Sequence, residues 1–339
     1  MSEIRYDRLY GRHVIIAPER MHRPDTVAPR LPSEEGTDTC PFCEGNEGMT
    51  PPEIYAIRKA GSHANEPGWR TRVVPNLYKA VQIETPHRRH FGWFEHEEGF
   101  GAHEIIIDTP KHYTSMAEWS TKEIVFWLQT MGVRVADLRR ERRIAYISLF
   151  KNEGAAAGAT QGHSHTQLIG VPVVPETQRV YFEHAAAHFH EHGTALLSTM
   201  IAHEAAAQKR IVATQGDFWA FCPYAAAYPF ETIIAARTLH GQIDTLDADA
   251  LQDAAELLHA MLVRLKKQLG VMAFNLEIAT PPLHDADAWG LLEQTDSMFP
   301  FMIRIMPRLY RFGGFEVSTQ MLINPVAPED AAKLLRGDA

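Results

Sequence analysis

Apolar residues recur at helical spacing in two long segments of the chain. The first follows Ser120 and Glu123, which are spaced as in an N-terminal capping box. Its apolar positions are Ile124, Trp127, Leu128, Met131, Val135 and Leu138. The second segment covers residues 247–267, with Leu251, Ala254, Leu258, Met261 and Leu265. A stripe of this kind buries one face of a helix, so the sequence predicts two long amphipathic helices.

Shorter apolar runs predict strands around these helices. They are RVVPN (72–76), HEIIIDTPKH (103–112), IAYISLF (144–150), LIGVPVV (168–174), FETIIAARTLH (230–240), FNLEIAT (274–280) and FMIRIMP (301–307). The order of strand, helix, strand and strand occurs twice, with an offset of about 130 residues, as expected for an internal repeat. We therefore predict a duplicated α+β fold, in which each repeat is an antiparallel sheet with a long helix packed on it. The first repeat would cover residues 1–175, a helical connector 176–225 and the second repeat 226–339.

Residues 176–210 contain alanine runs and four histidines, and we interpret them as a polar helical linker. The histidines are His184, His188, His190 and His192. They could form a metal site or a solvated helix face. Because the sequence shows no residue that would orient them as metal ligands, the solvated face is favoured.

Composition and charge exclude several classes of protein. The chain has 339 residues, of which 45% are hydrophobic, which is enough for a large core. Its net charge of −9 argues against a surface that follows nucleic acid. No apolar run is long enough to cross a bilayer, and the first residues lack the pattern of a secretory signal. These features predict a cytoplasmic protein with neither a nucleic-acid nor a membrane partner.

Two of the three cysteines lie in CPFC, at Cys40 and Cys43. A Cys-x-x-Cys motif is typical of half a zinc site or of a redox pair. Glycine and threonine precede this motif and Glu-Gly-Asn follows it, whereas a redox motif needs a strand before it and a helix after it. Zinc is therefore the favoured cofactor, and His112 and His163 are the candidates for the two remaining ligands.

The stretch GHSHTQ places His163, His165 and Gln167 at alternate positions next to a predicted strand. Side chains two residues apart on a strand point to the same side, so all three can meet one ligand. The two histidines could both bind a metal, or one could bind it and the other act as a nucleophile. Glycines precede them at Gly154, Gly158 and Gly162, and the exposed amides of such a loop can hold phosphate oxygens. A neutral imidazole that attacks phosphorus would form a phosphohistidine intermediate.

Several motifs in one order resemble the galactose-1-phosphate uridylyltransferase family, the branch of the histidine-triad superfamily with a duplicated fold. They are APERMHRPD, CPFC, RVVPN, HEIIIDTPKH, the glycine-alanine run after Asn152, HSHTQ and GGFEVSTQMLINPVAPEDAAKLLR. The resemblance covers nearly the whole chain. It implies two histidine-triad-like repeats, a homodimer, and nucleotide-sugar and sugar-phosphate substrates.

The resemblance also implies a role for individual residues. His165 would be the nucleophile that carries the nucleotidyl group, and Cys40, Cys43, His112 and His163 would hold a structural zinc. Gln167 and Thr160 would contact the transferred phosphoryl group, and Asn152 would position it. Arg20 and Arg23 would face the substrate's phosphates, and Asn76 would lie where the nucleoside binds.

The second half departs from the family's pattern. Ala279, Pro300 and Met302 stand where relatives often have histidines, which makes a second metal improbable. Phe315, Glu316 and Gln320 would approach the hexose, but the usual Gly-Thr-Gly is replaced by Ser-Thr-Gln at residues 318–320. The identity of the acceptor is therefore left open.

Three functions follow. The leading interpretation is ping-pong transfer of UMP between a UDP-sugar and a sugar 1-phosphate through a nucleotidyl-histidine, as part of galactose metabolism. The alternative keeps this covalent step but uses an adenylyl donor, as in ADP-glucose phosphorylase or ADP-sulfurylase. The third is a nucleotide-binding protein without catalysis, which would have no need of His165.

Overall fold

The computed structural model describes residues 2–22, 39–112, 115–238, 241–284 and 295–338. Its centre is a ten-stranded sheet in which every neighbouring pair is antiparallel. The strands are β3 (Tyr55–Arg58), β4 (Trp69–Pro75), β7 (Ala102–Ile107), β8 (Tyr146–Glu153), β9 (His165–Val171), β10 (Ile211–Gln215), β11 (Phe218–Phe221), β12 (Thr232–Ala236), β13 (Phe274–Ile278) and β14 (Met302–Pro307). The seven predicted strands all lie in this sheet.

The two halves of the sheet have the same order from opposite edges. From one edge the order is β3-β4-β7-β9-β8, and from the other it is β10-β11-β12-β14-β13. The strands β8 and β13 pair at the centre, where Asn152 lies opposite Asn275. This arrangement confirms the predicted duplicated α+β fold. The exact domain boundaries stay a prediction.

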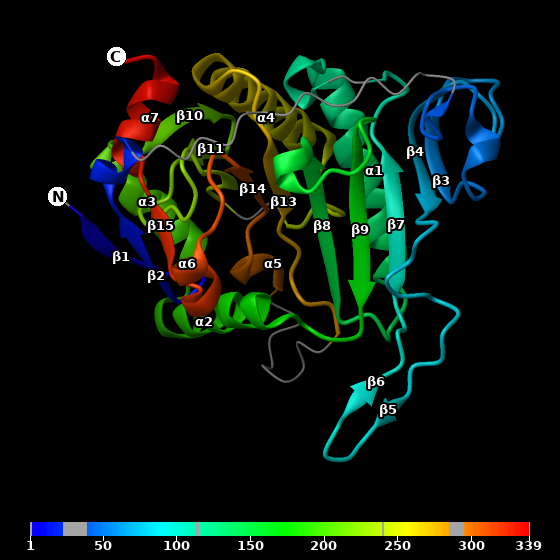
Figure 1. The fold of residues 1–339 in the computed structure, drawn as a ribbon, viewed down its shortest axis with the longest axis horizontal. Helices are drawn as coiled ribbons and strands as arrows, with labels where there is room; N and C mark the ends of the chain where they lie inside the picture. The colour runs from blue at the N-terminus through cyan, green and yellow to red at the C-terminus, as the bar shows by residue number, and fades with distance from the viewer. Residues whose placement is uncertain (1, 23–38, 113–114, 239–240, 285–294, 339) are drawn as a thin grey trace.

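The two predicted helices are present and pack against each other on one face of the sheet (Figure 1). Helix α1 (Thr121–Leu138) begins with the predicted capping box, in which Ser120 and Glu123 exchange hydrogen bonds. Helix α4 (Ala248–Leu269) is capped by the side chain of Asp247. The apolar stripes of both helices join strands from both halves in one core. Because α1 and α4 cover one face of the sheet, a functional site in the first half would lie on the other face.

The segment after β9 is helical, as predicted, but it is not a polar linker throughout. Helices α2 (Glu176–His192) and α3 (Leu196–Ala207) bury an apolar face that includes Tyr181 and Phe182. This face packs on the second half of the sheet together with Phe299, which follows the short helix α5 (Thr295–Met298). Strands β10 and β11 also fall within the range expected for the connector. The alanine runs do not reveal this burial in the sequence, because alanine occurs on both the buried and the exposed faces of a helix.

Smaller elements surround the central sheet. A second sheet joins β1 (Glu3–Asp7), β2 (Arg12–Ile16) and β15 (Leu322–Asn324), with α6 (Gly314–Thr319) and α7 (Pro328–Arg336) on either side of β15 in the chain. Short β5 (Arg89–His90) and β6 (His96–Glu97) form a hairpin that projects away from the body (Figure 1). Short 3₁₀ turns are η1 (Pro18–His22), η3 (Glu47–Met49), η4 (Met116–Glu118) and η5 (Ala155–Ala157). Among the described helices, none has the length and apolar character that a membrane crossing requires.

Candidate active site

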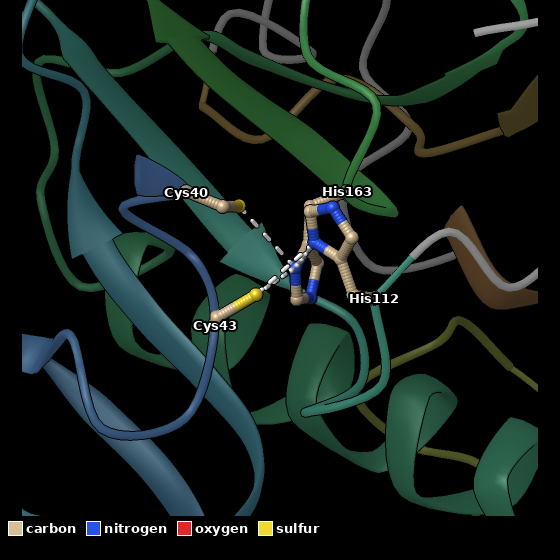
Figure 2. A group of neighbouring side chains, drawn as sticks. All are labelled: Cys40, Cys43, His112 and His163. Carbon is tan, nitrogen blue, oxygen red and sulfur yellow. Dashed lines mark hydrogen bonds between the residues drawn. The ribbon is translucent and has the colours of Figure 1, made fainter. Parts of the chain in front are cut away.

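Three separate segments bring two cysteines and two histidines together (Figure 2). Cys40 and Cys43 lie in a turn closed by a hydrogen bond from the Cys43 amide to the Cys40 carbonyl. His112 follows β7, and His163 precedes β9. The four ligand atoms all lie within 4.8 Å of one another, and no other such group occurs in the part of the chain that the structure describes. The histidines of α2 form no such group.

The spacing of these atoms fits a tetrahedral zinc ion. The Cys43 Sγ atom lies 3.1 Å from His112 Nδ1 and 3.6 Å from His163 Nδ1. Around zinc, sulfur and nitrogen ligands would be separated by about 3.5 Å and two nitrogens by about 3.3 Å. The two Nδ1 atoms are 3.4 Å apart. The donor set and the distances therefore both suit zinc.

The other ring nitrogen of His163 is tied to the backbone. Its Nε2 donates to the Thr109 carbonyl oxygen over 2.7 Å, which leaves Nδ1 without a proton and directed at the cysteines. Burial lowers the pKa of His163 to about 4, so the ring is neutral at physiological pH. A neutral histidine whose outer nitrogen bonds a carbonyl is the form in which histidine binds a metal.

His165 begins β9, and its ring is held by its neighbour in the motif. Its Nδ1 donates to the His163 carbonyl oxygen over 2.9 Å, so Nε2 is the nitrogen with a free lone pair. Burial lowers the pKa of His165, which favours the neutral form of its imidazole. The Phe42 ring packs on both imidazoles, with centroids 6.2 Å from His163 and 5.5 Å from His165. The segments that carry the candidate metal ligands thus hold the His165 ring through the His163 carbonyl and the Phe42 ring.

Alternation along β9 places the side chains of His165 and Thr166 on opposite faces of the sheet. Thr166 accepts a hydrogen bond from Trp127 Nε1 of α1, so its side chain points toward the helices. The side chains of His165 and Gln167 therefore point to the opposite face. On that face the small cluster formed by Trp69, Val74, Ile105 and Ile107 packs against Phe42. The CPFC turn consequently covers the sheet beside His165.

A buried ion pair holds the HSH segment from the helix face. Lys151 Nζ lies 2.8 Å from Asp108 Oδ2 and donates to Ser164 Oγ over 2.6 Å. Ser164, which lies between the two histidines, donates to the same Asp108 oxygen over 3.1 Å. Lys151 and Asp108 are at most 1% exposed. This network fixes the backbone that carries both imidazoles.

Two predicted phosphoryl-contacting amides are oriented by other side chains. Asn152 Oδ1 accepts from Asn275 Nδ2 over 2.8 Å, and Gln167 Oε1 lies 3.0 Å from His103 Nε2. Lys151 is the last residue of β8 that pairs with β9, and its partner there is Thr166. Asn152 directly follows Lys151 and His165 directly precedes Thr166, so Asn152 and His165 lie next to each other across the two strands. The NH₂ groups of Asn152 and Gln167 are therefore available as donors beside His165.

The glycine-alanine run forms a tight loop next to Asn152. Turn η5 ends at Gly158, whose φ of 89° lies in the left-handed region that favours glycine. Asn275 also donates to the Ala157 carbonyl over 2.8 Å, which anchors the loop to β13. Thr160 is exposed in the following turn and makes no hydrogen bond to His165.

The structure brings only part of the predicted substrate site together. Asn76 follows β4, where its Nδ2 lies 2.9 Å from His103 Nε2, so it joins the group around Gln167. Arg20 is exposed in η1, and its only hydrogen bond among the described residues is from its backbone amide to Ala17. Arg23 lies outside the described residues.

The residues predicted for the hexose lie elsewhere. Phe315 and Glu316 belong to α6, and Gln320 caps its end. Helix α6 lies well away from β9 in Figure 1, and Phe315 is 45% exposed. Within a single chain, the described contacts do not connect these residues with His165.

Sequence reasoning missed four residues that support the site. Asn275 could have been found from the repeat, because KNEG in β8 and FNLE in β13 place asparagine on equivalent strands. His103 lies in the HEIIIDTPKH motif but had no assigned role. Lys151 lies in β8 and Asp108 directly follows β7, and neither carried a signal, because a charged residue in or next to a strand is normally expected to be exposed.

Comparisons with known proteins identify the family to which the chain belongs. The family described as galactose-1-phosphate uridyl transferase, N-terminal domain, matches residues 1–175. ADP-glucose phosphorylase from Arabidopsis thaliana is 32% identical over 98% of this chain and 92% of its own length. The chain belongs to the galactose-1-phosphate uridylyltransferase family. A domain of unknown function (DUF4921) also matches residues 98–336.

Other members of the family are more distant in sequence. Galactose-1-phosphate uridylyltransferase from Thermotoga maritima is 24% identical over 99% of this chain and 98% of its own length. The crystal structure of the Arabidopsis ADP-glucose phosphorylase with bound ADP-glucose has a TM-score of 0.81 and 31% identity, and it covers 99% of both chains. A uridylyltransferase structure has a TM-score of 0.74 at 21% identity, covering 99% of this chain and 98% of its own, which supports the shared fold. The family and the fold therefore point to a nucleotidyl-transferring enzyme.

Proposed function

We propose that this enzyme moves an adenylyl group from an ADP-sugar to inorganic phosphate through a covalent bond to His165. The sequence alone favoured a uridylyl group. The comparisons support the adenylyl alternative better, because the relative named ADP-glucose phosphorylase is 32% identical, against 24% for the Thermotoga uridylyltransferase. Glucose is the sugar in our proposal because that relative's name specifies it.

The proposed reaction has two displacements at the same phosphorus. In the first, His165 Nε2 attacks the α-phosphorus of ADP-glucose, and glucose 1-phosphate leaves with the bridging oxygen. In the second, an oxygen of inorganic phosphate attacks that phosphorus, the bond to nitrogen breaks, and ADP leaves. Splitting the exchange in this way replaces one difficult encounter of two anions by two easier steps.

The observation that carries this proposal is the hydrogen bond from His165 Nδ1 to the His163 carbonyl, 2.9 Å long. It fixes the tautomer in which Nε2 is the nucleophile and stabilises the positive charge that develops on the ring during attack. The amides of Asn152 and Gln167 would donate to the phosphoryl oxygens as their charge changes. Asn76 would contact the nucleoside.

Cys40, Cys43, His112 and His163 would hold the zinc ion. When bound, zinc would supply folding free energy and would hold the segment that carries the nucleophile. It would take no part in the displacements.

Intact-mass spectrometry tests the proposal directly. Mixing the protein with ADP-glucose in the absence of phosphate should add the mass of one AMP residue, and adding phosphate should remove it with release of ADP. His165→Ala should abolish the adduct while melting temperature and zinc content stay unchanged. If His165→Ala still forms the adduct, or if ADP-glucose adds no mass to the wild-type protein, the proposal is wrong.

The second candidate is uridylyl transfer to a sugar 1-phosphate, which the match of residues 1–175 to the uridyl transferase family favours. The same experiment with UDP-glucose separates the two, because a UMP residue differs in mass from an AMP residue. An adduct from adenylyl sulfate alone would instead indicate an ADP-sulfurylase. Binding without any adduct would indicate a nucleotide-binding protein.

We also propose that the active form is a homodimer. Phe315, Glu316 and Gln320 lie on or beside an exposed helix away from β9, so a second chain would have to bring them to His165. Refolding a mixture of His165→Ala and Glu316→Ala chains should restore part of the activity that each variant lacks. A fully active wild-type protein that elutes as a monomer would contradict this arrangement.

A further inference from the structure

His103 connects two parts of the candidate site that are distant in sequence. It lies on β7 and is 9% exposed, with its side chain on the same face as Gln167. Its Nδ1 lies 3.1 Å from the backbone nitrogen of Ala80, and its Nε2 lies 3.0 Å from Gln167 Oε1. Its carbonyl also accepts from the Asn76 amide over 2.9 Å.

The backbone contact decides which ring nitrogen carries the proton. The amide of Ala80 can only donate, so His103 Nδ1 must accept and the proton must lie on Nε2. That proton is then directed at Gln167 Oε1, which can only accept.

The opposite tautomer fits less well. Asn76 Nδ2 lies 2.9 Å from the same Nε2, and it could donate there only if Nδ1 carried the proton. With the proton on Nδ1, the Ala80 amide and His103 Nδ1 would both be donors, and they would face each other. His103 Nε2 and Gln167 Oε1 would both be acceptors and would also face each other. The Nε2–H tautomer satisfies two of the three contacts, and the other satisfies one.

The fixed proton on His103 determines how the Gln167 amide is turned. Because its oxygen is occupied by His103, its NH₂ group faces away from β7 with no hydrogen-bond acceptor among the described residues. Gln167 follows His165 by two residues on the same strand face. The amide therefore presents N–H groups, rather than a carbonyl oxygen, toward a phosphoryl group held at His165.

We propose that His103 is a positioning residue that locks Gln167 as a hydrogen-bond donor for the transferred phosphoryl group. The inference rests on the proposed nucleotidyl transfer. An amide turned by 180° would place its oxygen against phosphoryl oxygens and repel them. His103 would act through Gln167 without touching the substrate.

Two substitutions separate this role from simple packing. In His103→Gln the amide nitrogen lies near the position of Nε2 and can still donate to Gln167. In His103→Asn the shorter side chain reaches only the Nδ1 position, so its oxygen can accept from Ala80 while the bond to Gln167 is lost. His63→Asn, at an exposed histidine, is the matched control.

The readout is the single-turnover rate at which ADP-glucose modifies His165, measured by rapid quench and intact mass. We expect His103→Asn to lower this rate by about 100-fold, the scale for a misplaced group in an active site. His103→Gln should recover most of the loss, and His63→Asn should have no effect. In a Gln167→Ala background, His103→Asn should cause no further loss, because the group it positions is already absent.

Each outcome has a distinct meaning. Equal losses in His103→Asn and His103→Gln, or a full additional loss in the Gln167→Ala background, would overturn the positioning role, because packing alone would then explain it. Melting temperatures of the variants identify any that fail to fold. If the wild-type protein forms no adduct with ADP-glucose or UDP-glucose, the proposed function fails first. The side-chain connection can still be tested by the 15N shifts of the Gln167 amide, which should change in His103→Asn but not in His103→Gln.

Discussion

Replacing Lys151 by methionine should destabilise the protein strongly, because it leaves a buried carboxylate without a counter-ion. Lys151 Nζ lies 2.8 Å from Asp108 Oδ2, and both side chains are at most 1% exposed. The other oxygen of Asp108, Oδ1, is buried without a hydrogen-bond partner among the described residues, so the neutral Ser164 hydroxyl is the group that still donates to this carboxylate. Methionine has a similar length and volume, so it leaves little cavity.

The expected size of the effect follows from this burial. Removing one partner of a buried ion pair costs about 3 to 5 kcal/mol in the free energy of unfolding. The lost bond from Lys151 to Ser164 is included in this range. For a chain of 339 residues, 4 kcal/mol corresponds to a fall in melting temperature of about 6 °C.

Urea denaturation followed by tryptophan fluorescence measures the effect, with zinc and protein concentration held constant. The double variant Lys151→Met with Asp108→Asn removes both charges, and its loss should be smaller than the sum of the two single losses by about 2 to 3 kcal/mol. Arg140→Met, at an exposed side chain, is the control for loss of a surface charge. Additive losses, or a Lys151→Met variant within about 0.5 kcal/mol of wild type, would refute the reasoning, since surface substitutions cause changes of that size.

Two further predictions concern the metal group and the second repeat. In the folded protein, thiol alkylation should be slow at all three cysteines, because all three are buried. A chelator should make Cys40 and Cys43 accessible to the reagent. Cys222 should react only after unfolding, because burial raises the pKa of its thiol to about 12. Mass spectrometry counts the alkylated thiols, and rapid alkylation of Cys222 in the native state would contradict this assignment. Asn275→Ala should lower the rate of adduct formation by about tenfold, because the amide of Asn152 loses the bond that orients it, 2.8 Å long. Asn275→Asp keeps an acceptor but no donor and should behave as the alanine variant does; an unchanged rate in both would show that Asn152 needs no orientation.

Local patterns predicted the two long helices and the strands of the central sheet. Both long helices follow from their apolar stripes, and Ser120 forms the capping box that its spacing with Glu123 indicated. The repeated order of elements predicted the duplicated sheet. These predictions succeeded because periodicity and capping depend on residues that are close together in the chain.

Contacts between distant segments could not be predicted in the same way. His103 and Gln167 are 64 residues apart, and Lys151 and Asp108 are 43 apart, so only strand pairing brings them together. The alanine-rich helix α2 was interpreted as polar, although Tyr181 and Phe182 bury its inner face against the sheet. The amphipathic signal was weak because alanine is tolerated on both faces.

The sequence by itself determined the duplicated fold, because apolar periodicity and a repeated order of elements encode it along the chain. It also predicted the four candidate metal ligands and His165 as the candidate nucleophile, from CPFC, HSH and the family resemblance. Only the tertiary structure decided which ring nitrogen of His165 is free, how the amides of Asn152 and Gln167 are turned, and that α6 lies far from β9. The physical reason is that hydrogen-bond direction depends on the carbonyls and rings that packing brings from other strands. The type of a residue fixes which hydrogen bonds its side chain can donate or accept. Its neighbours in space decide which of those hydrogen bonds form.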